Sequence, residues 1–392
     1  MAKLVPPHGG ELVSRLVPEA EKANRLAEAQ HLKRIILSSR EVSDLIMIGI
    51  GAFSPVTGFM DEPDYRRSSF DMHLADGMLW PVPITLAPPD ADTVRSITDG
   101  EHVALVDGDT GQIAGTMTVS GRYAYNKREE AVHVFRTDDE KHPGVEKLMA
   151  QGDLCLAGEV TLLDEAGYPE RFPAEYARPV ETRATFLDRG WSTVVAFQTR
   201  NPLHRSHEYL TKVALEIADG LFLHPIVGAL KEGDIPAETR LKCYHALLDQ
   251  YYPKDRVVMK VYPMEMRYAG PREAILHAII RQNFGCSHLC VGRDHAGVGS
   301  YYGTFEAQEI FDELKPGELH LQPLKFENTF YCYQCDGMAS AKTCPHTDAD
   351  RLSVSGTKLR AMLAAGERPP AEFSRPEVIE VLMEYYREAA GK

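Results

Sequence analysis

Beyond about residue 179, short apolar runs alternate with helix-forming segments, and this alternation constrains the fold more than any other feature. The apolar runs, each long enough for one buried strand, are Ser192–Phe197, Leu221–Gly228, Arg256–Tyr262 and Ser287–Gly292. The helix-forming segments before and between them lie at 179–189, 208–219, 236–250 and 271–283. Strands that alternate with helices of this length build a parallel sheet covered by helices on both faces. The sequence therefore predicts a doubly wound α/β domain over residues 179–328.

The first part of the chain has a different pattern. The segment Ser38–Glu41 predicts a capping box at the start of an early helix. From about residue 79 to residue 163 short β-rich runs follow, and a Gly/Asp turn within 103–119 predicts a hairpin. We expect a β-rich N-terminal domain over residues 1–165 that serves as a scaffold without catalytic residues.

Two further parts complete the predicted organisation. Residues 166–178 combine prolines, a glycine and charges, which indicates a linker. Residues 329–392 hold a cysteine-rich loop and then helix-forming segments, the last from about Arg375 to Ala389. We expect a small C-terminal α/β domain here. The length of 392 residues suits such a division into two or three domains.

Composition excludes several classes of function. A net charge of −14 argues against a nucleic-acid or anionic-membrane partner, because both need a basic surface. The longest apolar stretch is too short to span a bilayer, and the first residues lack the apolar region of a signal peptide. Seven cysteines, three of them close together, favour a cytoplasmic chain with a metal site over a secreted disulfide framework.

The decamer Gln198–His207 is the strongest candidate for a functional site. It lies where a predicted buried strand ends and a helix begins, and ligands bind at that edge of open α/β sheets. The helix N-terminus attracts anions, and Arg200, His204, Arg205 and His207 add basic groups. Histidines three apart are often only a polar cap on an exposed face, but the preceding strand and the Gln-Thr-Arg-Asn quartet favour a site for a polyphosphate and a second anion.

The decamer Gln198-Thr-Arg-Asn-Pro-Leu-His-Arg-Ser-His207 resembles the signature of ATP sulfurylases, also called sulfate adenylyltransferases. The block Gly292-Arg-Asp-His-Ala-Gly297 is similar to the second hallmark of that family. The resemblance continues through Met266–Glu273 and Ser355–Arg360 and covers most of the chain. It implies an N-terminal domain similar to the PUA fold, in the form of a β-barrel, and a nucleotidyltransferase domain after it.

The implied reaction joins sulfate to the α-phosphorus of ATP and gives adenylyl sulfate (APS) and pyrophosphate. Sulfate is fully ionised at pH 7, so a general base has no proton to remove, and positioning and charge stabilisation remain as the work of the protein. The resemblance implies that Gln198, Arg200 and the backbone of Ala296 hold sulfate. Catalytic residues are expected at Thr199, Arg200, Asn201, His204 and His207. These five residues with Gln198, Gly292, Arg293, Asp294 and His295 are expected to bind ATP.

Other positions leave two interpretations open. Lys231 and Asp234 follow a predicted strand and either contact phosphates and water-bound Mg²⁺ or form a solvated loop. Arg267 either lines the substrate site or forms a structural ion pair. The segment with Thr357, Lys358 and Arg360 either meets the phosphates or caps a helix. Mg²⁺ is expected as the counter-ion of ATP, because it prefers oxygen ligands and keeps water molecules. The chain contains no Walker A motif, so the phosphates must be held by the decamer.

The cysteine-rich loop predicts a second, structural metal site. Cys332 and Cys335 form a Cys-x₂-Cys knuckle, and Cys344 with His346 completes four ligands for tetrahedral Zn²⁺. Asp348 is the alternative fourth ligand, and three buried thiols without metal are the alternative to a zinc site.

Two rival functions remain at this point. One is a nucleotidyltransferase that adenylates another acceptor, which the Gln-Thr-Arg-Asn quartet disfavours because it suits a small oxyanion. The other is an RNA-binding protein, which the acidic charge disfavours. By resemblance we expect a homodimer that acts on small molecules.

Overall fold

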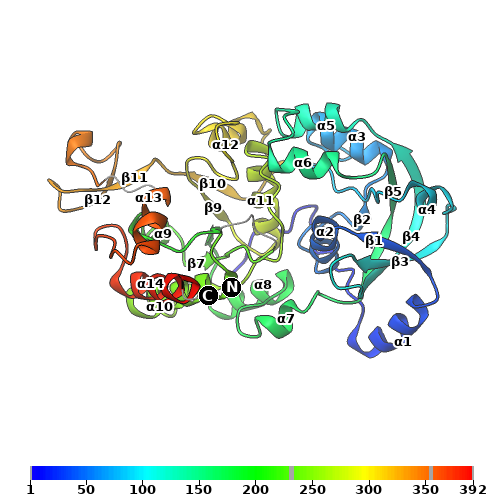
Figure 1. Ribbon diagram of the computed structural model, residues 1–392, viewed down its shortest axis with the longest axis horizontal. Helices are drawn as coiled ribbons and strands as arrows, with labels where there is room; N and C mark the ends of the chain where they lie inside the picture. The colour runs from blue at the N-terminus through cyan, green and yellow to red at the C-terminus, as the bar shows by residue number, and fades with distance from the viewer. Residues whose placement is uncertain (1, 229–233, 353–355, 391–392) are drawn as a thin grey trace.

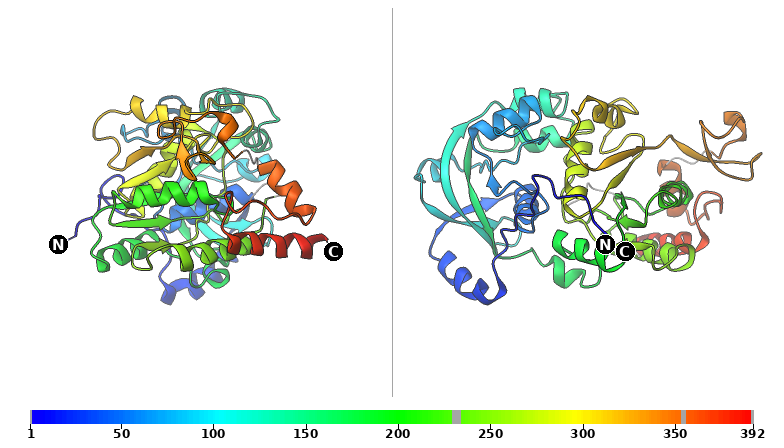
Figure 2. Two further views of the ribbon diagram at one scale, coloured as in Figure 1. Left: turned by 90° about the vertical axis from the view of Figure 1, so that its left-hand side faces the viewer. Right: turned by 180° about the vertical axis from the view of Figure 1, so that it is seen from behind.

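The computed structural model describes residues 2–228, 234–352 and 356–390. Within these residues, two five-stranded sheets and one two-stranded hairpin follow one another along the long axis of an elongated molecule (Figure 1). The N-terminal sheet, the central sheet and the hairpin with the C-terminal helices appear in that order along the axis from either side (Figure 2).

The N-terminal sheet is mixed, with strand order β1-β3-β4-β5-β2. Its elements are α1 (Glu19–Ala29), β1 (Lys33–Leu37), α2 (Ser39–Gly49), β2 (Gly58–Phe59), α3 (Glu62–Asp71), α4 (Ala91–Arg95), β3 (His102–Asp107), β4 (Ile113–Ala124), α5 (Lys127–Val134), α6 (Pro143–Met149) and β5 (Leu154–Leu162). The predicted capping box is present, because Ser38 and Glu41 each bind the backbone N–H of the other. The predicted hairpin is β3 and β4, which pair antiparallel.

A buried ion pair between α2 and the loop that follows β8 joins the N-terminal part of the chain to the central part. Arg267 donates from Nη2 to both carboxylate oxygens of Asp44 at 2.7 Å. The two side chains are only 3% and 2% exposed. The sequence left two roles open for Arg267, lining the substrate site or forming a structural ion pair. The structure shows the ion pair.

We expect Asp44→Ala to lower the free energy of unfolding by about 3–5 kcal/mol, because it leaves a buried guanidinium without its partner. Arg95→Ala is the control, since Arg95 and Asp92 pair on the surface and are 65% and 98% exposed. Exposed pairs stabilise by only about 0–1 kcal/mol. Urea denaturation followed by circular dichroism measures both changes, and equal midpoints for the two variants would contradict the expectation.

The central sheet is parallel throughout, with strand order β10-β9-β6-β7-β8. Its elements are α7 (Tyr168–Arg171), α8 (Pro179–Asp188), β6 (Val194–Phe197), α9 (Arg205–Leu215), β7 (Gly220–Leu223), α10 (Ala237–Tyr251), β8 (Val257–Met259), α11 (Pro271–Asn283), β9 (His288–Val291), α12 (Glu306–Glu309), a 3₁₀ turn (Ile310–Glu313) and β10 (Gln322–Lys325).

Both faces of this sheet are buried, as the sequence predicted for a doubly wound fold. Val194 and Ala196 of β6 belong to the same apolar core as α8 and α11, whereas Val195 and Phe197 belong to the core that contains α9, α10 and α14. Because successive side chains of a strand point to opposite faces, this division places helices on each side of the sheet.

The strand order has a switch point between β6 and β9. Counted along the central sheet, β6 to β10 are its first to fifth strands and lie in the order 5-4-1-2-3. Connections from β6 and from β9 therefore leave in opposite directions, and a crevice opens beyond their carboxyl ends. The two hallmark segments, Gln198–His207 and Gly292–Gly297, follow these two strands. The topology thus brings the two segments together.

Helix α9 differs from the sequence-based expectation. It begins at Arg205, with His204 as its N-cap, and ends at Leu215, whereas the apolar periodicity predicted 208–219. The periodicity marks only the residues that face the core, and the first turn of α9 faces the crevice instead. His207 consequently lies in the first turn, beside the N-terminal N–H groups of the helix.

The last part of the chain packs beside the central sheet. It contains β11 (Thr329–Cys332), β12 (Gly337–Ser340), a 3₁₀ turn (Asp348–Asp350), α13 (Gly356–Ala364) and α14 (Pro376–Ala390). Val378 and Leu382 of α14 share an apolar core with Tyr244 and Leu247 of α10. In the described parts of the chain, no helix is both long and apolar enough to cross a bilayer.

Candidate active site

A cleft of about 1040 Å³ opens at the switch point of the central sheet. One wall comes from the segments after β6 and β9, and the other from β11, β12, α13 and residues 372–374. All residues that line it lie between Phe197 and Tyr386. The lining of this cleft thus contains no residue of the N-terminal part.

The cleft brings together the predicted site residues of both hallmark segments. From the first segment it is lined by Gln198, Thr199, Arg200, Asn201, His204 and His207. From the second segment it is lined by Gly292, Arg293, Asp294, His295 and Ala296.

Backbone hydrogen bonds fix the turn that carries Thr199 to Asn201. Thr199 Oγ1 accepts from the Asn201 N–H at 3.0 Å, and Thr199 O accepts from the Ile226 N–H at 3.0 Å. Tyr244 OH donates to Asn201 O at 2.9 Å. The main chain of the turn is therefore held from α10 and from the segment that follows β7, which leaves the Arg200 and Asn201 side chains available to the cleft.

Arg200 and Gln198 present buried polar atoms that have no protein partner. Arg200 Nη1 and Gln198 Oε1 both lack a hydrogen bond. The Arg200 guanidinium lies over the ring of Tyr268, 5.1 Å from its centroid. Buried polar groups are nearly always paired in folded proteins, so atoms of this kind at the wall of a cleft indicate the position of a polar ligand. A guanidinium fixed by a ring below can offer a forked contact to an oxyanion.

His204 and His207 pack against each other at the N-terminus of α9, with their ring planes tilted by 31°. Their ring centroids are 3.8 Å apart, and Phe373 and Phe197 flank the pair at 5.1 and 5.4 Å. Burial lowers the pKa of His204 to about 4 and lowers the pKa of His207 well below its usual value. Both imidazoles are therefore neutral at pH 7 before an anion binds. Nδ1 of each ring has no protein partner.

These depressed pKa values predict that polyphosphate binding takes up protons. Bound phosphate charge raises the pKa of both rings. Affinity for the magnesium complex of a non-hydrolysable ATP analogue should therefore fall as pH rises through the pKa values of the complex, with up to about one proton taken up per histidine. Calorimetry in buffers of different ionisation enthalpy measures this number. His204→Asn should reduce it and His288→Asn, outside the cleft, should not; equal uptake in all three proteins would contradict the prediction.

The second hallmark segment forms a strained turn. Asp294 and Ala296 have φ values of 53° and 56°, which non-glycine residues seldom adopt. The turn is held by the Asp294 N–H, which donates to Thr304 O at 2.9 Å, and by Ala296 O, which accepts from the Gly270 N–H at 3.1 Å. Arg293 pairs with Asp294 at 3.2 Å. Strain that the surrounding structure sustains is typical of functional turns.

Of the residues for which the sequence left two interpretations open, some line the cleft and others lie outside the described residues. Asp234 lines the cleft, and its Oδ2 is buried without a partner, so it is available to Mg²⁺-bound water. Arg360 also lines the cleft. Lys231 and the side chain of Thr357 lie outside the described residues.

The far wall of the cleft contains residues that the sequence analysis did not single out. They include Glu327, Asn328, Thr329, Tyr331, Glu372 and Phe373. Two contacts bring this wall to the first hallmark segment: the Arg205 N–H donates to Phe373 O at 3.0 Å, and Ser206 Oγ donates to Thr329 O at 3.3 Å. Only the proximity of this wall to the predicted metal loop offered a sequence cue.

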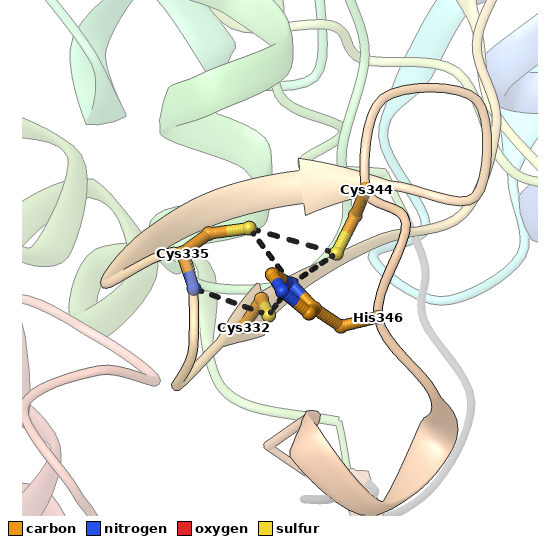
Figure 3. Close-up of side chains that lie close together, drawn as sticks. All are labelled: Cys332, Cys335, Cys344 and His346. Carbon is orange, nitrogen blue, oxygen red and sulfur yellow. Dashed lines mark hydrogen bonds between the residues drawn. The ribbon is translucent and has the colours of Figure 1, made fainter.

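Cys332, Cys335, Cys344 and His346 converge beside this wall (Figure 3). His346 Nδ1 lies 3.4, 3.2 and 3.6 Å from the three sulfurs in that order, and the Cys335 and Cys344 sulfurs are 3.7 Å apart. Tetrahedral zinc bonds of standard length imply about 3.8 Å between sulfurs and about 3.6 Å between sulfur and nitrogen. The cluster therefore has the dimensions of a metal site. Asp348 instead pairs with Arg351, which favours His346 as the fourth ligand.

A parallel sheet with this strand order and two histidine-bearing, cation-rich segments at its switch point define a nucleotidyltransferase-type α/β protein. The family model described as ATP-sulfurylase matches residues 174–385, and the one described as PUA-like domain matches residues 5–165. The chain belongs to the ATP sulfurylase family, which confirms the resemblance found in its motifs.

Similar proteins agree with this assignment. A sulfate adenylyltransferase of Desulforamulus reducens is 56% identical over 98% of both chains, and one of Pelodictyon phaeoclathratiforme is 54% identical over 98% of this chain and 95% of its own. Among solved structures, a hexameric APS kinase from Thiobacillus denitrificans superposes with a TM-score of 0.77 at 28% identity, over 97% of this chain and 69% of that one.

Proposed function

We propose that this protein is a sulfate adenylyltransferase that converts ATP and sulfate into APS and pyrophosphate. The observation that carries the proposal is the convergence of both hallmark segments at the switch point of the sheet, where the first segment presents buried side-chain N and O atoms that have no protein partner. Adenylation of another acceptor and RNA binding are the alternatives, and membership of the family disfavours both.

In the proposed reaction a sulfate oxygen attacks the α-phosphorus in line, and the bond to the bridging oxygen of pyrophosphate breaks. Arg200 and Gln198, with the backbone N–H of Ala296, hold sulfate. Thr199 and Asn201 bind phosphate oxygens while the geometry at phosphorus changes. His204 and His207, at the positive end of α9, stabilise the charge that develops on pyrophosphate.

The second hallmark segment completes the nucleotide site. Gly292, Arg293, Asp294 and His295 are proposed to bind ATP. The position where a Cβ of Gly292 would stand has no atom within 4 Å, so the main chain there faces open space that a nucleotide can enter. Asp234 is proposed to hold Mg²⁺ through water, and Mg²⁺ supplies positive charge at the phosphates.

The cysteine cluster is proposed to hold a structural Zn²⁺. Four protein ligands leave no open coordination position, so the metal supports the loop and takes no part in the chemistry. Zn²⁺ is a metal ion that three thiolates and one imidazole bind readily.

Four further features belong to the proposal. They are the division into 1–165, 166–178, 179–328 and 329–392, a homodimeric assembly, action on small molecules without nucleic acid or membrane, and a cytoplasmic location. Within the first, the boundary between 1–165 and the later parts is supported by the separate matches of the two family models, and the boundary at 328 stays a prediction. The last is supported by the seven cysteines, none of which forms a disulfide bond in the structure.

The test of the function is pyrophosphate release from MgATP, measured with sulfate, without sulfate and with phosphorylated cofactor precursors as acceptors. We expect release only with sulfate. Release with another acceptor would support a nucleotidyltransferase but would show that its acceptor is not sulfate. No release with any acceptor, together with salt-dependent RNA binding, would overturn the proposal.

A further inference from the structure

A buried histidine on α11 contacts both hallmark segments from below the cleft. His277 Nδ1 lies 3.1 Å from Nε2 of His295, which belongs to the second segment. Its Nε2 lies 3.4 Å from Nε2 of Gln198, which belongs to the first segment. The same Nε2 lies 3.3 Å from Oε1 of Glu273, one helical turn earlier. His277 and Glu273 are 0% exposed, and neither lines the cleft.

The charges around His277 fix the position of its proton. Burial acts to raise the pKa of Glu273, but hydrogen bonds from His277 and from backbone N–H groups, with the charge of Arg267, hold that pKa below its usual value. Burial lowers the pKa of His277, and the nearby Arg281 and Arg267 oppose the raising effect of Glu273. A neutral imidazole beside a carboxylate carries its proton on the nitrogen that faces the carboxylate, which here is Nε2.

This tautomer decides the orientation of the Gln198 amide. A protonated Nε2 of His277 cannot accept a hydrogen bond from the Gln198 NH₂ group, because both are donors. The two ends of an amide have the same shape and are assigned from their hydrogen bonds. With the two ends interchanged, Oε1 of Gln198 lies 3.4 Å from His277 Nε2 and shares its one N–H with Glu273 Oε1, at 3.3 Å, in a three-centre hydrogen bond. The NH₂ group then occupies the position where Oε1 otherwise has no partner.

We propose that Glu273 and His277 form a positioning relay that holds the Gln198 amide with its NH₂ group toward the substrate oxyanion. The relay rests on the proposed function for the identity of that oxyanion as sulfate. The relay gives His277 a role in the affinity for sulfate, although His277 itself touches no substrate. The Nδ1 of His277 accepts from His295 Nε2–H, so the same residue also fixes the tautomer in the second segment.

The conservative variant separates this role from simple packing. A glutamine side chain places its NH₂ group where histidine places Nε2, so His277→Gln keeps the donor to Gln198, whereas His277→Leu removes it. We expect His277→Leu to raise the KM for sulfate about 10-fold or more, the range for losing a hydrogen bond to a charged group. We expect less than about a 3-fold change in the KM for sulfate in His277→Gln.

A matched control is His224→Phe. His224 is also a 0% exposed histidine of the central domain, but it contacts Val261 O and the rings of Phe222 and Phe284 rather than the hallmark segments. We expect its sulfate KM to equal that of the wild type. If His277→Leu and His277→Gln raise the sulfate KM equally, or if His224→Phe raises it as much, the relay is wrong and His277 acts only through packing.

A spectroscopic measurement keeps the relay testable if sulfate proves not to be the substrate. Nitrogen-15 NMR of histidine-labelled protein distinguishes an imidazole protonated at Nε2 from one protonated at Nδ1. We expect the resonance that disappears in His277→Gln to be that of the Nε2–H form, and Glu273→Gln to shift it toward the Nδ1–H form. If the resonance assigned to His277 in the wild type is that of the Nδ1–H form, the relay is overturned whatever the substrate. Absence of sulfate-dependent turnover in the wild type overturns only the proposed function.

Discussion

Arg200→Ala is expected to abolish most sulfate-dependent pyrophosphate release, with kcat/KM for sulfate lowered about 10²–10³-fold. Arg200 is the one member of the Gln-Thr-Arg-Asn quartet whose side chain carries a permanent positive charge. Its Nη1 is buried without a partner, and its Cζ lies over the Tyr268 ring, 5.1 Å from the ring centroid. Removing it deprives a doubly charged nucleophile of a fixed forked donor in a partly dehydrated site.

Arg200→Lys is the informative companion variant. It keeps the charge but loses the planar fork, so we expect it to recover only a small part of the activity. Steady-state kinetics with sulfate and MgATP varied separately measure both variants. Activity of Arg200→Lys equal to that of the wild type would show that charge alone matters and would contradict the forked contact. An unchanged KM for sulfate in Arg200→Ala would show that the oxyanion binds in another part of the cleft.

Metal removal is the second change with a large expected effect. Among the residues that the structure describes, the buried apolar cluster of the β11–β12 hairpin consists of Phe330, Cys332, Ala339 and Cys344. A two-stranded hairpin with so small a core is barely stable alone, whereas a structural zinc ion supplies about 10–16 kcal/mol of apparent binding free energy in small domains. The hairpin also carries Thr329, Tyr331 and Met338 of the far cleft wall. Loss of the metal should therefore open residues 329–352 and raise the KM for MgATP about 10-fold or more.

His346→Ala and Asp348→Ala test this expectation as a pair. His346 Nδ1 contacts all three sulfurs, whereas Asp348 pairs with Arg351. Elemental analysis should find one zinc per chain in the wild type and in Asp348→Ala, and much less in His346→Ala. Limited proteolysis should cut only His346→Ala within the hairpin. A zinc-free wild type that resists proteolysis would refute the structural role of the metal.

Much of the central fold could be predicted because its strands are buried on both faces. Continuous apolar runs such as Ser192–Phe197 and Leu221–Gly228 differ plainly from the helices between them. The strand ends were less well defined, since β7 covers only Gly220–Leu223 and β8 only Val257–Met259. A run of apolar residues shows that a segment is buried, but hydrogen bonding to a neighbouring strand decides where pairing stops.

The motifs alone determined the family, the two hallmark segments and the three cysteines of the candidate metal site, because each depends on residue types at short spacing. Only the tertiary structure decided that Arg267 pairs with Asp44 and that residues 327–331 and 372–373 close the cleft. It alone placed Glu273 and His277 beneath Gln198 and His295. These contacts join residues far apart in the chain, and their partners are set by the packing of helices against the sheet, which no local spacing encodes.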